Sequence, residues 1–294
     1  MSENVISAKN LVRRFGKTVA VNSAAFEVPR GSAFGLFGTN GAGKTTTIRM
    51  LLGLLMPNSG TMDVLGMDPR KSGAKIRSRT GYVPEGHHFY DWMKVVELVR
   101  FTKSFYPAWN DAEEKKLLGR FGLDPDKKIR ELSKGMVAKL ALTLALAHRP
   151  ELLVLDEPTS GLDPVVRREF IESMIDMIHE EGRTILISSH LIAEVEGLVD
   201  RVAIMKSGKI LLVKTADELR ESTRRVRMVF DKPAQKALPG ALSVSANGHA
   251  VEAVFADWSE GSAERLQAEL VPQSMEVERM GLEDIFVAYV GKSE

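Results

Sequence analysis

The spacing of hydrophobic and polar positions changes several times along the 294-residue chain. Near the N-terminus, short apolar runs broken by Gly and Pro predict paired strands, and residues 32–38 read as a buried strand. Residues 44–55 have helical apolar spacing, and the segment 90–149 contains two amphipathic stretches, 92–105 and 111–122. The apolar run 151–155 then predicts a strand buried on both faces.

Strands that alternate with helices predict an α/β fold with a largely parallel sheet and antiparallel N-terminal strands. After about residue 215 the pattern changes to short alternating runs, with Asn247-Gly248 between two of them as a hairpin turn. We therefore expect one domain over 1–215, with a helical subdomain at about 86–149. A small α+β accessory domain is expected over 216–294.

A glycine-rich loop follows the first buried strand. The sequence GTNGAGKT matches the phosphate-loop pattern G-x-x-x-x-G-K-[ST] and precedes a helix. Its glycines let backbone N–H groups point at phosphate oxygens, its lysine reaches the β- and γ-phosphates, and its last hydroxyl ligates Mg²⁺. The alternative is a plain glycine-rich turn. The predicted nucleotide-binding residues here are Gly38, Thr39, Asn40, Gly41, Ala42, Gly43, Lys44, Thr45 and Thr46.

Two carboxylates stand where the strand 151–155 ends. Asp156 is suited to the Mg²⁺ shell, and Glu157 to polarising the attacking water as general base. Adjacent acids at a strand end also occur as plain surface residues, so this assignment depends on the phosphate loop. His190 ends another apolar strand, where it can contact the γ-phosphate, although a lone histidine is more often structural.

Composition narrows the class of protein further. There are 40 Lys and Arg against 39 Asp and Glu, so the formal net charge of +1 gives no reason to expect a nucleic-acid partner. The absence of cysteine excludes disulfides and thiolate chemistry. The longest apolar stretch, 140–148, is far below the roughly 20 residues of a membrane span. Residues 1–10 do not resemble a signal peptide.

These motifs, in this order, resemble the ATP-binding cassette family. The phosphate loop is followed by GYVPE at 81–85, LSKGM at 132–136, LLVLDEP at 152–158, SGLD at 160–163 and then His190. The resemblance covers about 1–215 and is closest to ATPase subunits of bacterial drug and antibiotic exporters. The segment LEDIFVAYV at 282–290 also resembles the C-terminal end of proteins in that branch.

The resemblance implies a pair of cassettes packed head to tail, with ATP between them. In that arrangement Ser133 and the backbone of Gly135 bind the γ-phosphate held by the other copy. Taken alone, Ser133 is better explained as a helix cap, and it is the set of motifs that reverses this interpretation. The resemblance also implies that Phe15 stacks on adenine, that Glu85 lies near Mg²⁺ in place of the usual Gln, and that Asp163 connects the two sites. Lys134 and Met136 depart from the family's usual Gly and Gln.

The function implied is ATP hydrolysis that powers a separately encoded permease, with ATP and Mg²⁺ as cofactors. The partners are then a second cassette, identical or related, and the permease, which holds the chain at the inner face of the cell membrane. Export of a drug, antibiotic or lipid-like compound is expected. A soluble cassette ATPase acting on ribosomes or nucleic acid is the alternative, and no N-K-x-D motif favours a GTPase.

The aromatic segment 86–93, GHHFYDWM, follows Glu85. We expect either that it helps to form the groove for a cytoplasmic helix of the permease, or that its aromatic side chains belong to the core of the helical subdomain.

Overall fold

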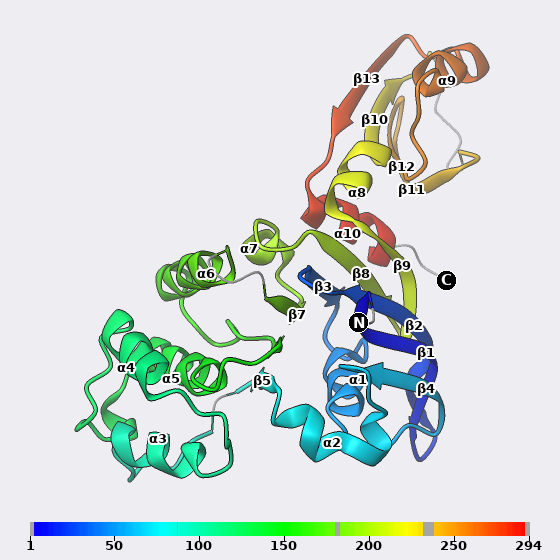
Figure 1. The fold of residues 1–294 in the computed structure, drawn as a ribbon. Coiled ribbons are helices and arrows are strands. Elements are labelled where there is room, and N and C mark those ends of the chain that lie inside the picture. The colour runs from blue at the N-terminus through cyan, green and yellow to red at the C-terminus, as the bar shows by residue number, and fades with distance from the viewer. Residues whose placement is uncertain (1–2, 87, 180–182, 232–237, 292–294) are drawn as a thin grey trace.

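The computed structural model describes residues 3–86, 88–179, 183–231 and 238–291, and of 176–179 only the backbone. Three sheets organise the chain (Figure 1). The first is antiparallel, with the strand order β2-β1-β4. Its strands are β1 (Asn4–Phe15), β2 (Thr18–Pro29) and β4 (Ser59–Val64). The predicted antiparallel N-terminal strands are therefore present.

The second sheet carries the nucleotide motifs. Its order is β5-β6-β7-β3-β8-β9, with parallel neighbours except for the antiparallel pair β8–β9. Its strands are β5 (Thr80–Val83), β6 (Leu152–Asp156), β7 (Thr184–Ser189), β3 (Ala33–Gly38), β8 (Arg201–Lys206) and β9 (Lys209–Thr215). The order places β3 beside β7, and β7 beside β6, so the motifs at the carboxyl ends of these strands share one edge.

Strand β6 shows why its sequence is an uninterrupted apolar run. All five of its residues are buried. Leu152 and Val154 belong to the core beneath the first sheet, whereas Leu153 and Leu155 belong to the core on the opposite face. The strand is therefore covered on both sides, as the sequence predicts for a parallel strand.

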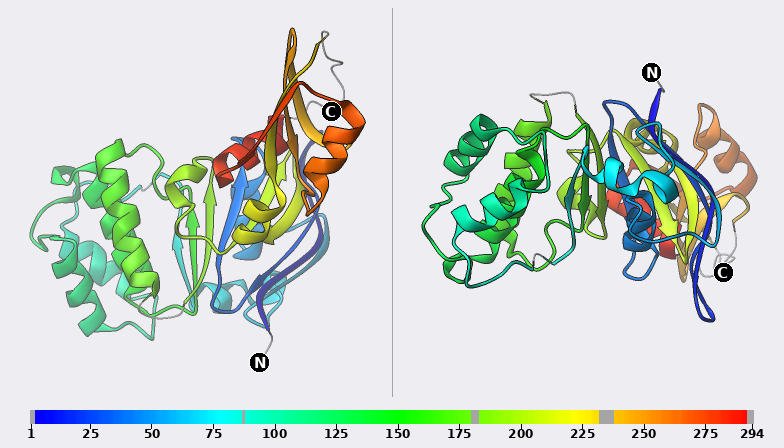
Figure 2. Two further views of the ribbon diagram at one scale, coloured as in Figure 1. Left: turned by 90° about the horizontal axis from the view of Figure 1, so that it is seen from above. Right: turned by 60° about the horizontal axis from the view of Figure 1, so that its bottom comes forward.

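Helices cover the second sheet and form a lobe beside it (Figures 1 and 2). The lobe contains α3, α4 and α5, with α6 alongside, as both views show. The helices of the cassette are α1 (Lys44–Leu51), α2 (Pro69–Arg77), α3 (Val95–Lys103), α4 (Asp111–Arg120), the 3₁₀ turn η1 (Ile129–Glu131), α5 (Lys134–Leu146), α6 (Pro164–His179) and α7 (Ile192–Val195).

The aromatic segment before α3 divides between core and surface. Phe89 packs against the large core, but Tyr90 is 55% exposed and Trp92 is 65% exposed. The assignment to the core of the helical subdomain thus holds for Phe89 only. His87, in the same segment, lies outside the described residues.

The third sheet lies apart from the other two, in the order β11-β12-β10-β13 (Figures 1 and 2). It has its own small core around Val226, Val251 and Phe255, and the predicted hairpin turns at Gly248. The elements of this part are α8 (Ala216–Ser222), β10 (Arg224–Val229), β11 (Ala241–Asn247), β12 (Ala250–Phe255), α9 (Ser262–Leu270), β13 (Ser274–Arg279) and α10 (Leu282–Gly291).

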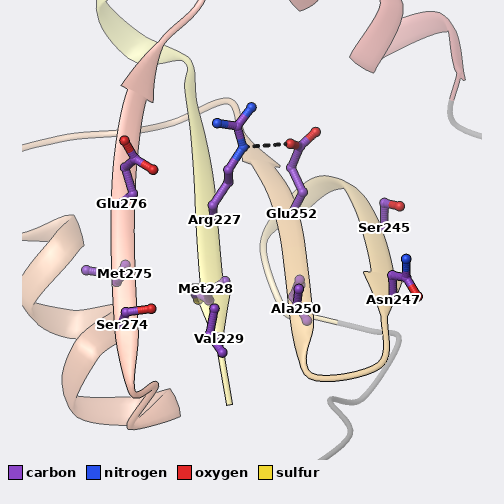
Figure 3. A pocket seen from close by; sticks show the side chains of 11 residues that line it. Arg227, Met228, Val229, Ser245, Asn247, Ala250, Glu252, Ser274, Met275 and Glu276 are labelled. Carbon is purple, nitrogen blue, oxygen red and sulfur yellow. Dashed lines mark hydrogen bonds and ion pairs between the residues drawn. The ribbon is translucent and has the colours of Figure 1, made fainter.

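One face of this sheet is charged and open. Arg227 donates to Glu252 beside a shallow pocket of about 570 Å³ (Figure 3). The last helix behaves differently, because Leu282, Ile285 and Phe286 of α10 pack into the large core of the cassette. The C-terminal segment is therefore anchored to the cassette by its final helix. The domain boundary near residue 215 remains a prediction.

Candidate nucleotide site

The phosphate loop joins β3 to α1, and its glycines are required by the backbone. Gly43 has φ 109°, and a Cβ there would lie 2.4 Å from the carbonyl oxygen of Ala20. A Cβ on Gly38 would lie 2.5 Å from the carbonyl oxygen of Met205. Space therefore excludes a larger residue at both points, and the left-handed conformation also disfavours one at Gly43, so the loop curls tightly before the helix starts. The first turn of α1 then presents its free backbone N–H groups to an anion bound in the loop.

Lys44 is folded into this loop and is 5% exposed. Its Nζ donates to the carbonyl oxygens of Gly38 at 2.7 Å and Thr39 at 3.3 Å. The same Nζ forms an ion pair with Glu157 Oε1 at 2.9 Å. In this arrangement the predicted phosphate-binding cation is neutralised by the predicted general base, and both are sheltered from water.

Asp156 ends β6 and is fully buried. Its Oδ1 accepts from Thr45 Oγ1 at 3.0 Å and from Ser188 Oγ at 2.7 Å. Burial raises the pKa of this carboxyl, and the charges of Glu85 and Glu157 act in the same direction, whereas the two hydroxyl donors lower it. The carboxyl therefore stands in a site that favours a cationic ligand.

Glu157 follows directly and takes the left-handed φ of 48°. Its backbone N–H donates to the carbonyl oxygen of Ser188 at 3.2 Å and to the hydroxyl oxygen at 3.1 Å. Its Oε2 lies 2.8 Å from His190 Nδ1, and the backbone N–H of His190 donates to the same oxygen at 3.3 Å. The turn at Glu157 thus brings its side chain between Lys44 and His190.

The donor set fits a magnesium ion that a bound nucleotide would share. Asp156 Oδ2 is buried and has no hydrogen-bond partner among the described residues. It lies beside the Thr45 hydroxyl, and Glu85 is near enough to raise the pKa of Asp156. No group of three or more acidic or His side chains in the described ranges could hold a metal alone. Mg²⁺ commonly binds through one or two carboxylates plus substrate phosphates and water, so these residues suffice.

The remaining predicted residues of the loop are arranged around Lys44. Thr39 and Asn40 are exposed at its tip, Gly41 has φ 78°, Ala42 is buried and Thr46 is half-buried. Phe15 ends β1 with 47% of its surface exposed, and the Arg13 guanidinium lies 4.6 Å from the centre of its ring. The ring is thus available for stacking, with a cation on one side.

The residues of the LSKGM motif at 132–136, which we name the signature residues, lie at another place in the fold. Ser133 is the N-cap of α5, and its Oγ accepts from the backbone N–H of Met136 at 3.3 Å. Gly135 is buried against α6, while Ser133 and Lys134 are exposed. Among the described contacts, none joins these residues to the phosphate loop of the same chain.

Asp163 caps the next helix along. Its Oδ1 accepts from the backbone N–H of Val166 at 3.1 Å, and its carbonyl oxygen accepts from the backbone N–H of Arg167 at 2.9 Å. The carboxylate is exposed at the start of α6. Its predicted role between two sites is not tested by these contacts.

Sequence reasoning missed Ser188. Its hydroxyl donates to Asp156, and its two oxygen atoms both accept from the Glu157 backbone. The register of β6 and β7 places Asp156 directly opposite Ser188. The position of Ser188 at the carboxyl end of the strand before His190 was a usable signal.

The comparisons with known proteins agree with this geometry. A family model described as "ABC transporter" matches residues 21–160. The chain is 40% identical over 223 residues to the probable multidrug ABC transporter ATP-binding protein YbhF of Escherichia coli K12, covering 74% of this chain and 38% of that protein. It therefore spans little more than a third of that relative.

Other relatives are covered over most of their length. The bacitracin transport ATP-binding protein BcrA of Enterococcus faecalis is 34% identical over 76% of this chain and 73% of its own. The ABC transporter ATP-binding protein YtrB of Bacillus subtilis is 29% identical over 98% of both chains. The second match extends through the C-terminal segment.

Solved structures show the same architecture. One described as the ATP-binding subunit of an ABC transporter has a TM-score of 0.66 and 29% identity, covering 74% of this chain and 92% of the other. CbiO1 from Clostridium perfringens has a TM-score of 0.64 and 27% identity, covering 73% and 89%. The chain therefore belongs to the family of ATP-binding proteins of ABC transporters.

Proposed function

We propose that this chain hydrolyses ATP to power export by a separate membrane-spanning permease. The observation that carries the proposal is the meeting of Lys44, Glu157 and His190 beside the Asp156 carboxyl, at the ends of adjacent strands. A cation, a general base and a site for Mg²⁺ are the groups that phosphoryl transfer to water requires.

The contacts of Lys44 suggest how ATP engages the site. A γ-phosphate that enters the loop competes with Glu157 for Lys44 Nζ, because both are anions seeking the same buried cation. Glu157 is then released from Lys44 while its other oxygen stays with His190, and it can accept a proton from an attacking water. Asp156 and Thr45 would hold Mg²⁺, which supplies charge neutralisation at the phosphates.

A second cassette is the proposed partner for the signature residues. The start of α5 combines an exposed Ser133, an exposed Lys134 and a helix N-terminus, which suits an anion. Because these groups make no described contact with their own phosphate loop, we assign them to the γ-phosphate held by another copy. Identical and related second cassettes are both compatible with this arrangement.

A surface next to the lobe suits the permease. Tyr90, Trp92, Phe101 and Phe105 are exposed and contact one another, with ring centres 5.2–6.3 Å apart from pair to pair. We name these four residues the aromatic cluster. A cavity of about 180 Å³ lies nearby, lined in part by Pro84, Phe89 and Tyr106. An apolar surface of this kind, in the segment that follows Glu85 in the chain, supports docking of a cytoplasmic helix of the permease.

The export assignment comes from the relatives. YbhF is described as a probable multidrug transporter protein and BcrA as a bacitracin transport protein. No helix among the described residues is long and apolar enough to cross a membrane. We therefore propose a chain attached to the inner face of the cell membrane through its permease, with a drug or antibiotic as the exported compound.

The test uses a tagged Glu157→Gln chain, which keeps the side-chain shape but loses the base. It is recovered from detergent-solubilised native membranes with Mg-ATP, and a Trp92→Glu chain on the same background is the matched control. A polytopic membrane protein recovered with the first chain and depleted with the second is expected. Recovery of ribosomes or nucleic acid without a membrane protein would instead identify a soluble cassette ATPase.

A further inference from the structure

An ion pair away from the phosphate loop ties α6 to α7. Arg167 Nη1 pairs with Glu194 Oε1, while Arg167 Nη2 donates to the carbonyl oxygen of Leu162 at 2.8 Å. The second oxygen of Glu194 accepts from Thr159 Oγ1 at 3.2 Å. Both charged side chains are 21% exposed. We name Thr159, Leu162, Arg167 and Glu194 the clamp.

The clamp joins the segment that follows Glu157 to the segment that follows His190. Thr159 lies two positions after Glu157, and the backbone N–H of Ser160 donates to the Glu157 carbonyl oxygen at 3.0 Å. Glu194 lies four positions after His190, in α7. The two segments are thus joined twice, once by the contact between Glu157 Oε2 and His190 Nδ1 and once by the clamp.

The same turn of α6 supports the signature residues. Arg167 and Val166 donate their backbone N–H groups to Asp163, as the N-terminal capping contacts of α6. A Cβ on Gly135 would lie 2.2 Å from Val166 Cγ1, so the start of α5 rests directly on this turn. A displacement of Arg167 would therefore disturb both the 157–163 segment and the start of α5, where the signature residues lie.

The chemistry of the clamp requires an arginine. One guanidinium reaches a carboxylate and a carbonyl oxygen at once, which the single ammonium group of lysine cannot reproduce with the same planar geometry. Its neighbour Arg168 contrasts with it, since that side chain is 83% exposed and approaches Glu172 only at 3.9 Å. Exposed ion pairs such as Arg168–Glu172 contribute little to stability.

We propose that Arg167 and Glu194 are positioning residues for ATP hydrolysis. The clamp holds Glu157 against His190, and holds Asp163 and the start of α5 in register with them. Neither residue touches the phosphate loop in the described contacts, so they act through these groups. The inference rests on the proposed ATPase function and adds two residues to it.

The first experiment compares Arg167→Lys and Glu194→Gln with Arg168→Lys, measuring kcat and KM for Mg-ATP. The clamp variants should lower kcat about tenfold or more, since small misplacement of a reacting group is costly, while KM stays within about twofold. Arg168→Lys should match the wild type. Wild-type kcat in either clamp variant would overturn the proposal.

A double-mutant cycle separates positioning from general destabilisation. His190→Ala is measured with and without Glu194→Gln. If Glu194 acts through the Glu157–His190 contact, the second change should add less than about twofold once His190 is gone. Fully additive losses, or losses that follow lowered thermal unfolding temperatures, would overturn the inference. A wild-type chain that releases no phosphate would instead count against the proposed ATPase function itself.

Discussion

At the scale of single residues, Gly135 shows how a motif depends on a distant neighbour. The family resemblance of the sequence implies that the backbone of this glycine binds a phosphate. The structure adds a packing requirement, because Val166 occupies the space where a Cβ would stand. Gly135 is thus constrained by α6 as well as by any nucleotide.

We expect Gly135→Ala to displace the start of α5 and to destabilise the chain by about 1–3 kcal/mol, as overpacking usually does. Val166→Ala should rescue it, since the added Cβ would then face Val166 Cβ at 3.5 Å, an ordinary contact distance. Urea unfolding and ATPase rates of both single variants and the double variant test this. A double variant no better than Gly135→Ala would contradict the packing explanation.

The carboxyl pair at the end of β6 also illustrates this scale. In the sequence, the strand end together with the upstream phosphate loop predicts metal binding for Asp156 and base chemistry for Glu157. Their environments in the structure support that division: Asp156 has a buried free oxygen beside Thr45, whereas both Glu157 oxygens lie against cationic or ionisable side chains. Two adjacent acids have different surroundings because the backbone takes a left-handed turn at Glu157, and we propose different tasks for them on that basis.

At the scale of elements, a buried histidine follows the end of α5. His148 stacks on Tyr106 with ring centres 4.1 Å apart, and the backbone of Thr80, the first residue of β5, lies beside His148, so this pair stands where the lobe meets the second sheet. Burial, with a smaller effect from the charge of Arg183, lowers the pKa of His148 to about 4, although the backbone of Thr80 and Leu144 acts in the opposite direction. The imidazole is therefore neutral in the folded chain at neutral pH.

This shift predicts an acid-sensitive junction. The folded pKa lies below the unfolded value of 6.5, so the stabilising contribution is complete above pH 6.5 and is lost as pH falls towards 4. Between pH 7 and pH 5, the wild type should lose about 1–2 kcal/mol more unfolding free energy than His148→Phe, which keeps the stacking but cannot titrate. Urea denaturation at the two pH values measures this difference, and equal losses would refute it.

At the scale of the whole molecule, we assign separate surfaces to separate proposed partners. The phosphate loop and the signature residues are proposed to face a second cassette, and the aromatic cluster is proposed to face the permease. The third sheet lies away from both, held by α10 (Figure 1). A change at the aromatic cluster should therefore leave the nucleotide site intact.

We expect Trp92→Glu combined with Phe105→Glu to weaken association with the permease tenfold or more, since a charge must then be buried against an apolar surface. The ATPase rate of the separated chain should stay within about twofold of the wild type. The matched control is Val287→Glu, which places a charge on an exposed apolar residue far from the cluster in sequence, on α10. This variant should bind the permease normally. Undiminished binding by the double variant would remove the cluster from the interface.

The sequence by itself determined the order and type of most elements, the phosphate loop and the acids at the end of β6. These follow from local rules: apolar periodicity, glycines at strained turns, and the spacing within one strand–loop–helix unit. Phe89 and Trp92 mark where such rules end, because aromatic residues three positions apart look alike in sequence, yet Phe89 packs against the core and Trp92 is exposed.

Only the tertiary structure decided which distant residues meet. The ion pair of Lys44 with Glu157, the contact of Ser188 with Asp156 and the clamp between Arg167 and Glu194 join segments that are tens of residues or more apart. The packing of α10 into the cassette core, after an intervening sheet, is of the same kind. Such contacts depend on sheet order and helix packing, which local periodicity does not encode, because many side chains of suitable type compete for each partner until the fold places one of them there.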